Sequence, residues 1–269
     1  MNGSGILVGL AVGIAQGVLE WLPVSSEGNV ALLLSALGRT PERVVAFALF
    51  VHLGTALSAT VYYHGELREL AAVTPRWRPS RAFDEELASV TFLAVGTLVS
   101  GVVGLAAYAS LTGLFTASAG GGLLAAIGGL LVLTGAFQYA VRDVGGGRAT
   151  PDGVDAVAVG VAQGLAILPG VSRSGVTAGT LLLRGHEPNR AFRLSFLLAI
   201  PASVGGGLLA YVDTGIGIGA LAAAVALGAA AATGYATIGA LLRTADRLPF
   251  WGVCVCLGAL SLTGALLAA

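Results

Sequence analysis

The sequence predicts an all-α polytopic membrane protein with six transmembrane helices and two re-entrant helix hairpins, arranged as an inverted-topology internal repeat. The composition, six apolar segments and two broken apolar regions that copy one another predict this fold class. Of the 269 residues, 56% are hydrophobic and 10% are charged, and the mean hydropathy is +0.88. So few polar side chains cannot cover a soluble domain, which makes the membrane the expected medium. The formal net charge of +0 gives no reason to expect a nucleic-acid partner.

Six segments have the length of about 20 mostly apolar residues that a helix needs to cross a bilayer. They are approximately Val44–Tyr63, Ala88–Leu111, Ala119–Val141, Ala191–Val212, Ile216–Leu242 and Phe250–Ala268. No basic residue precedes the first apolar run, which argues against a cleaved signal peptide. We therefore expect six membrane crossings.

Two further apolar regions, Gly5–Leu37 and Gly153–Leu183, are each interrupted by a polar turn that contains proline, serine and glycine. Each region is expected to form two half-length helices that enter and leave the bilayer on one side. Irregular backbone at membrane depth is tolerated only where protein or a water-filled cavity satisfies its N–H and C=O groups. The two polar turns therefore indicate a cavity.

The two broken regions are copies of one another. Gly13–Val18 recurs as Gly160–Leu165, and Val24–Gly28 recurs as Val171–Gly175, both with an offset of 147 residues. We expect one membrane domain built from two repeats, residues 1–145 and 146–269. Inverted repeats with broken helices place their functional site near the midplane, where the two breaks meet.

Arginine counts predict the orientation in the membrane. Three crossings per repeat put the two repeats in opposite orientations. The loops on one side then carry Arg68, Arg76, Arg78, Arg81, Arg142, Arg148, Arg184, Arg190, Arg193, Arg243 and Arg247, and the other side carries Arg39 and Arg43. The arginine-rich side is expected to be cytoplasmic. A multi-pass plasma-membrane protein follows, with both termini extracytoplasmic and the first hairpin entering from outside.

The polar turns carry the candidate chemistry. Arg173 is the single charged residue between Asp155 and Arg184, and serines flank it. A guanidinium binds phosphate oxygens as a bidentate fork, and the N–H groups at a helix N-terminus favour the same ligand. Gln16 and Glu20 share one helix face. A carboxylate inside the bilayer is costly unless it is paired, solvated or metal-bound, so Glu20 is a functional candidate.

The two turns together resemble a known family. Gln16–Ser26 and Pro169–Gly175 are similar to the two signature motifs of the undecaprenyl-diphosphate phosphatases of the bacitracin-resistance type, and nearly the whole chain shares the likeness. The resemblance implies hydrolysis of a polyprenyl diphosphate to the monophosphate and inorganic phosphate, which recycles the lipid carrier. It also implies a divalent cation, Mg²⁺ or Ca²⁺.

The family's residues transfer to this chain with two departures. Glu20 matches the second acid of the Glu-x-x-x-Glu pattern, and Arg173 matches the phosphate-binding arginine. Gln16 stands where an acid is usual, and Asn29 stands where a histidine is usual. Asparagine cannot transfer a proton or accept a phosphoryl group. His52, inside the first crossing, is a possible replacement, although such a histidine is equally often a hydrogen-bonded packing residue.

The mechanistic hypothesis gives each residue a role. Arg173 and the helix N-termini hold the diphosphate, a cation bound partly through Glu20 neutralises the leaving phosphate, and Ser26 or a water attacks the terminal phosphorus. His52 completes the expected catalytic group, and the expected substrate-binding residues are Gln16, Ser25, Asn29, Ser172, Ser174 and Thr177. A homodimer is compatible with the sequence. The alternative function is a polyprenyl-phosphate transporter, because inverted repeats with broken helices also build secondary carriers.

Overall fold

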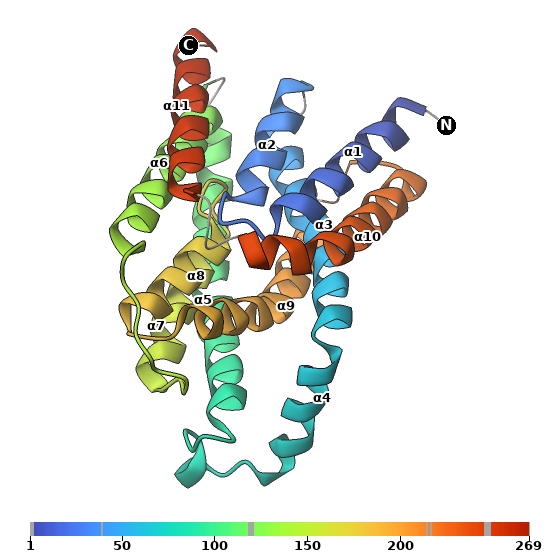
Figure 1. The fold of residues 1–269 in the computed structure, drawn as a ribbon. Coiled ribbons are helices and arrows are strands. Elements are labelled where there is room, and N and C mark those ends of the chain that lie inside the picture. The colour runs from blue at the N-terminus through green and yellow to red at the C-terminus, as the bar shows by residue number, and fades with distance from the viewer. Residues whose placement is uncertain are drawn as a thin grey trace.

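The structure is a computed structural model that describes residues 3–38, 40–117, 121–213, 215, 217–244 and 249–268. These residues form eleven α-helices and two short 3₁₀ helices (Figure 1). Within them, the extended pairing is limited to one isolated bridge between Arg148 and His186. The predicted all-α class is confirmed.

Six of these helices are long and apolar enough to cross a membrane, as predicted. They are α3 (Pro41–Tyr62), α5 (Ala88–Ala117), α6 (Gly122–Val141), α9 (Pro188–Asp213), α10 (Ala220–Thr244) and α11 (Phe250–Ala268). The expected starts at Ala119 and Ile216, and the loop residues Arg39 and Arg247, lie outside the described residues.

The two broken regions form two pairs of shorter helices. The first pair is α1 (Gly3–Leu19) and α2 (Ser26–Ala36), and the second is α7 (Gly153–Leu165) and α8 (Arg173–Leu183). None of the four exceeds 17 residues, which is compatible with re-entrant hairpins. Their turns meet as predicted, because the Gly170 N–H donates to Ser25 Oγ at 3.2 Å.

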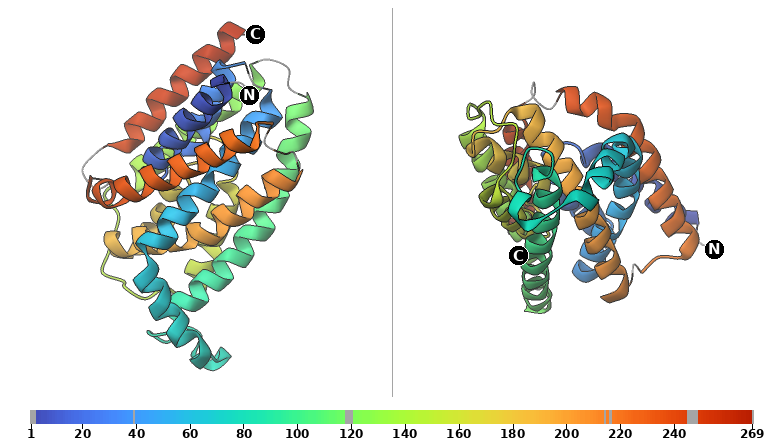
Figure 2. Two further views of the ribbon diagram at one scale, coloured as in Figure 1. Left: turned by 90° about the vertical axis from the view of Figure 1, so that its right-hand side faces the viewer. Right: turned by 90° about the horizontal axis from the view of Figure 1, so that it is seen from below.

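The helix packing follows the internal repeat. When each helix is replaced by its counterpart in the other repeat, every main packed pair becomes another packed pair or stays the same. Helix α1 packs along α10, and α7, its counterpart, packs along α5 (Figures 1 and 2). Helix α3 packs against its own counterpart α9, and α6 packs against α11. This pattern is what two related halves require, so the packing is compatible with the predicted internal repeat.

Small residues permit the close approach of α1 to α10. A Cβ added at Gly9 would lie 2.6 Å from the Ala222 carbonyl oxygen, so a side chain there cannot be accommodated without moving backbone. In the second repeat, a Cβ at Gly160 of α7 would lie 2.8 Å from Val99 Cβ of α5. Close glycine packing is a common way for membrane helices to associate.

The segment between α3 and α5 extends away from the helical body. It contains α4 (His64–Val73) and two 3₁₀ turns (Thr74–Arg76 and Pro79–Arg81), none of which has a buried residue. Figure 1 shows this segment projecting beyond the bundle. An exposed position fits the expected loop at the membrane edge.

Five charged or titratable side chains anchor the open end of the second hairpin. Asp155, fully buried in α7, accepts from Arg184 Nε at 2.7 Å and contacts His186 Nε2 at 2.9 Å and Arg148 Nη2 at 3.2 Å. Asp152 caps α7 and also pairs with both arginines. The anchor fixes the ends of α7 and α8, and α8 begins at the candidate phosphate-binding arginine.

The glycine packing predicts a position-specific loss of stability. Replacing Gly9 with leucine should lower the free energy of unfolding by about 1–3 kcal/mol, because the new side chain meets the backbone of α10. Thermal unfolding of the purified protein in detergent measures the change. Gly5→Leu on the same helix is the matched control, because no heavy atom lies within 4 Å of a Cβ there. Equal effects of the two substitutions would contradict the packing.

The anchor predicts a pH-dependent stability. Burial opposes ionisation of Asp152, but the Asp155 N–H and the Arg148 and Arg184 guanidinium groups outweigh it, so the pKa of the carboxyl lies below its usual value. The stabilisation is therefore complete above the unfolded pKa of about 3.9 and is lost as the pH falls through the folded pKa. Wild type should be more stable than Asp152→Asn at neutral pH, and the difference should vanish in acid.

Thermal unfolding across this pH range measures that difference. The matched control is Asp143→Asn, because the Asp143 side chain is 83% exposed. A constant difference between wild type and Asp152→Asn down to the lowest pH would contradict the linkage.

Candidate active site

Ser25 holds the turn of the first hairpin in an unusual conformation. Its φ angle of 58° is the only positive one of a non-glycine residue among the described residues. Its Oγ accepts from the Gly28 N–H at 3.2 Å, which caps α2, and from the Gly170 N–H of the other hairpin. Residues are held in sparsely populated conformations chiefly at functional sites. Here the conformation lets one hydroxyl bind both turns.

Glu20 is the polar centre of the site. Its carboxylate accepts from Gln16 Nε2 at 2.7 Å, from Ser26 Oγ at 2.8 Å and from Arg173 Nη2 of the other hairpin. His52 Nε2 lies 3.2 Å from the same carboxylate. Three hydrogen-bond donors and the His52 imidazole therefore surround the carboxyl group. Glu20 is 4% exposed, so the helix bundle removes this group from bulk solvent.

His52 joins the site from α3. Its Nδ1 lies 2.7 Å from the Ala48 carbonyl oxygen, and a carbonyl can only accept, so Nδ1 carries a hydrogen. Its Nε2 faces Glu20, and two lone pairs would repel there. One proton therefore joins the imidazole to the Glu20 carboxyl group. The histidine lies where a proton could be held next to Ser26.

Arg173 starts α8 and keeps half of its guanidinium free. Its Nη2 pairs with Glu20, whereas its Nη1 is buried and has no hydrogen-bond partner within the described part of the chain. A buried donor without a partner is costly. This donor is therefore placed for an anion that enters the site.

The other polar residues of the second turn are mostly occupied in holding it. Ser172 Oγ accepts from the Gly175 N–H at 3.3 Å as the cap of α8, and Ser174 Oγ donates to the Leu22 carbonyl at 3.3 Å. Thr177 is fully buried and bonds Ser195 Oγ at 2.6 Å. The two serines still line the cavity described below, and Thr177 does not.

Asn29 and Gln16, the two departures from the family pattern, also lie away from the cavity lining. Asn29 Nδ2 donates to the Val24 and Ser25 carbonyls at 2.8 and 2.9 Å, which braces the turn that holds Ser25. Gln16 is fully buried and positions Glu20. In this structure both support the residues that face the cavity.

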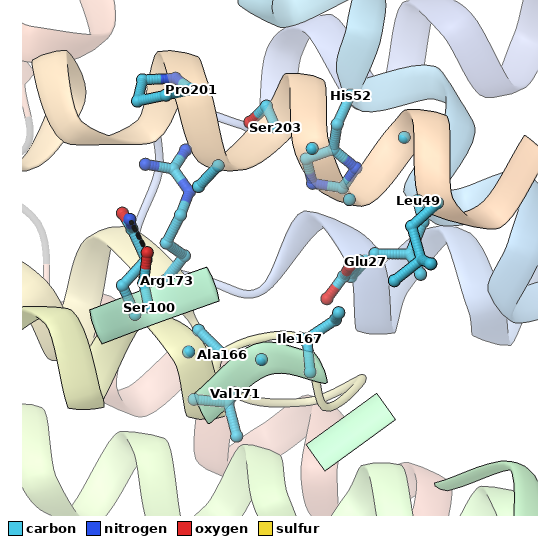
Figure 3. Close-up of a pocket in the computed structure, with 18 of the residues that line it drawn as sticks. Glu27, Leu49, His52, Ser100, Ala166, Ile167, Val171, Arg173, Pro201 and Ser203 are labelled. Carbon is cyan, nitrogen blue, oxygen red and sulfur yellow. Dashed lines mark hydrogen bonds between the residues drawn. The ribbon is translucent and has the colours of Figure 1, made fainter. Parts of the chain in front are cut away.

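The site opens into a cavity of about 600 Å³ between α3, α5, α9 and the two turns. Figure 3 shows Arg173 on one side of the open space, with His52 and Glu27 on the other. Polar and apolar side chains line the cavity together, and Figure 3 shows Leu49 and Ile167 next to Glu27. The apolar lining also includes Leu105, Leu208, Leu209 and Val212. Leu105 and Val212 are 57% and 81% exposed, so the cavity reaches the outer surface of the bundle.

The structure brings seven of the ten expected site residues to the cavity: Glu20, Ser25, Ser26, His52, Ser172, Arg173 and Ser174. It adds five polar residues that the sequence did not single out as site residues: Glu27, Thr97, Ser100, Gln163 and Ser203. Gln163 occupies the repeat position of Gln16, which was a usable signal. Ser100 and Ser203 are single hydroxyls in apolar helices and gave no signal.

Comparison with known proteins identifies the family. The family model of the bacitracin resistance protein BacA matches residues 9–260. The chain belongs to the BacA family. A relative from Haloarcula marismortui named undecaprenyl-diphosphatase is 49% identical over 267 residues, which are 98% of each chain. Relatives of the same name from Methanococcoides burtonii and Methanopyrus kandleri are 37% and 35% identical, over 94% and 93% of this chain and 95% and 92% of their own.

The range that matches the family model covers the second hairpin and five of the six crossings completely. It begins at residue 9, inside α1, and ends at residue 260, inside α11. The resemblance of the two motifs is thus confirmed at the level of the family.

The bond between the two turns predicts that Ser25 stabilises the whole site. Replacing Ser25 with alanine removes the cap of α2 and the acceptor of the Gly170 N–H, and should cost about 0.5–2 kcal/mol of unfolding free energy. Thermal unfolding in detergent measures the loss. Ser110→Ala is the control, because the Ser110 hydroxyl is exposed and bonds within its own helix. A neutral Ser25→Ala variant would contradict the bracing role.

Proposed function

We propose that this protein hydrolyses undecaprenyl diphosphate to undecaprenyl phosphate and inorganic phosphate within the membrane. The observation that carries the proposal is Arg173, which has an unpaired Nη1 and lines the same cavity as Ser26, whose hydroxyl is bonded to the Glu20 carboxylate. The relatives that match nearly the full chain are named undecaprenyl-diphosphatase, which supports the same reaction.

The cavity fits both parts of such a substrate. Arg173 and the serines supply polar groups for the diphosphate, and the apolar side chains of the lining suit a prenyl chain. Because Leu105 and Val212 border the outer surface, the chain can extend from the cavity into the surrounding lipid. All of these residues come from one copy of the protein, so a homodimer would hold one such cavity in each copy.

The contacts support attack by Ser26 on the terminal phosphorus. The Ser26 hydroxyl already donates to Glu20 Oε2. As Oγ bonds to phosphorus, its proton passes to Glu20, the bond to the bridging oxygen breaks, and undecaprenyl phosphate leaves. Water then attacks the phosphoserine, the Oγ–P bond breaks, and Ser26 recovers the proton from Glu20 as dihydrogen phosphate leaves.

Arg173 and His52 supply charge and position in this scheme. Nη1 of Arg173 can bind a phosphate oxygen while Nη2 keeps its ion pair with Glu20. His52 stays hydrogen-bonded to the Glu20 carboxyl group. This bond adjusts the basicity of the carboxyl group as the Ser26 proton arrives. In phosphoryl transfer such positioning and charge stabilisation supply most of the acceleration.

The expected divalent cation does not fit Glu20 as this carboxylate lies. Three hydrogen-bond donors and the His52 imidazole already surround its two oxygens. Among the described residues, no group of three or more histidine, cysteine or acidic side chains could hold a metal ion. A carboxylate that faces the cavity, Glu27, fits better. When bound, Mg²⁺ or Ca²⁺ would neutralise negative charge on the diphosphate.

The finer membrane placement is part of the proposal. Six apolar helices make this a multi-pass membrane protein. We place it in the plasma membrane with both termini extracytoplasmic, because the arginine-rich loops, including the one after α3, favour the cytoplasmic side.

Phosphate release from undecaprenyl diphosphate by the protein in detergent tests the proposal. Arg173→Ala and Ser26→Ala should each lower kcat by about 10²–10³-fold, the loss usual when one transition-state donor or its equivalent is removed. Arg76→Ala is the control, because its side chain is 65% exposed in the loop after α4. Binding of the lipid phosphate by wild type without phosphate release would instead support a transporter. If Ser26→Ala releases phosphate at a near-normal rate, water rather than Ser26 is the nucleophile.

A further inference from the structure

Glu27 is a buried carboxylate that takes no part in the proposed proton transfers. It lies in the first turn of α2, next to Ser26, and is 7% exposed. It lines the cavity, and Figure 3 shows its carboxylate directed into the open space. No hydrogen bond or ion pair from the described part of the chain reaches it. Such a group is costly at membrane depth unless a ligand compensates it.

The neighbouring groups do not supply that compensation. Arg173 is paired with Glu20, and the Nε2 atom of His52 also faces Glu20. The N-terminus of α2 favours an acid in its first turn, but this contribution equals only about half an elementary charge. The carboxylate therefore lacks a full positive partner within the described residues of the cavity.

Substrate increases the demand for positive charge. A terminal phosphate carries about two negative charges at neutral pH, and Arg173 offers it one guanidinium nitrogen without a partner, Nη1. A bound diphosphate would leave the cavity strongly negative. A divalent cation bound by both the diphosphate and Glu27 would offset this negative charge. It would also occupy the carboxylate lone pairs of Glu27, which have no other partner.

We infer that Glu27, rather than Glu20, is the protein ligand of the divalent cation in this site. Mg²⁺ is commonly held by one or two carboxylates together with substrate phosphate oxygens, and keeps several waters. A single carboxylate that faces a phosphate-binding arginine across the cavity meets that requirement, so no cluster of three ligating side chains is needed. The inference rests on the proposed function, because the diphosphate completes the coordination.

Binding of Mn²⁺ tests the assignment without relying on turnover. Electron paramagnetic resonance would measure Mn²⁺ bound to the purified protein, alone and with the non-hydrolysable probe farnesyl methylenediphosphonate. Wild type should bind Mn²⁺ with the probe present. Glu27→Gln, which keeps the shape of the side chain, should weaken that binding by about tenfold or more, a loss that even outer-shell substitutions can produce. Glu86→Gln is the matched control, because its side chain is 57% exposed outside the cavity.

Thermal unfolding provides a second readout that also shows whether the variants fold. A ligand that binds only the folded state raises the unfolding temperature. Mn²⁺ with the probe should therefore raise the midpoint of wild type and of Glu86→Gln, and not that of Glu27→Gln. Without metal, Glu27→Gln should unfold at or above the wild-type temperature, since it removes an uncompensated charge.

The outcomes separate this inference from the proposed function. Wild-type Mn²⁺ affinity in Glu27→Gln overturns the assignment, whether or not the protein releases phosphate. If Glu20→Gln no longer binds Mn²⁺ and Glu27→Gln still binds it, Glu20 is the metal ligand and the assignment is overturned. Wild type that binds no Mn²⁺ in either condition overturns it as well. If Glu27→Gln abolishes Mn²⁺ binding but the wild type does not hydrolyse undecaprenyl diphosphate, the metal-site assignment stands and the proposed enzymatic function is overturned.

Discussion

The ion pair between Glu20 and Arg173 is the constraint around which the rest of the structure is arranged. It joins the turns of two hairpins that are 153 residues apart in the chain. Removing one partner of a buried pair leaves an uncompensated charge and typically costs about 3–5 kcal/mol. The two turns are therefore held at a fixed distance, and the long helices pack around them. The same pair leaves one arginine nitrogen free, so the structural constraint also prepares an anion site.

Related repeats supply unlike groups to this junction. With the offset of 147 residues, Ser26 corresponds to Arg173 and Glu20 corresponds to Ile167. The two hairpins share the same backbone arrangement. The residue differences in their turns supply the different functional groups. The anchors differ as well, because Gly5 and Val8 stand where the second repeat has Asp152 and Asp155. The second hairpin is bound at its open end by charges, and the first is held there by apolar packing.

The sequence predicted the membrane crossings because hydropathy is a local property of each continuous run. It also predicted Glu20, Arg173 and His52 as candidates, since charged and titratable groups are rare in apolar helices. The cavity wall was not predictable, because it depends on how each helix is rotated about its axis. Thr177, expected to bind substrate, lies outside the cavity lining and bonds Ser195. Ser100 could not be found from sequence, because a serine that bonds its own helix, as Ser100 does with the Thr97 carbonyl, is common in membranes.

The opening of the cavity at Leu105 and Val212 has a kinetic consequence. A substrate that enters through a lipid-facing opening never passes through bulk water, and it searches for the site by lateral diffusion in two dimensions. The variable that governs occupancy is then the mole fraction of substrate among the lipids. Enlarging the bilayer at constant bulk substrate dilutes the substrate, while the phosphate product leaves into a three-dimensional volume. The rate of the reaction thus depends on the concentration of substrate in the bilayer, whereas its product accumulates as a concentration in solution.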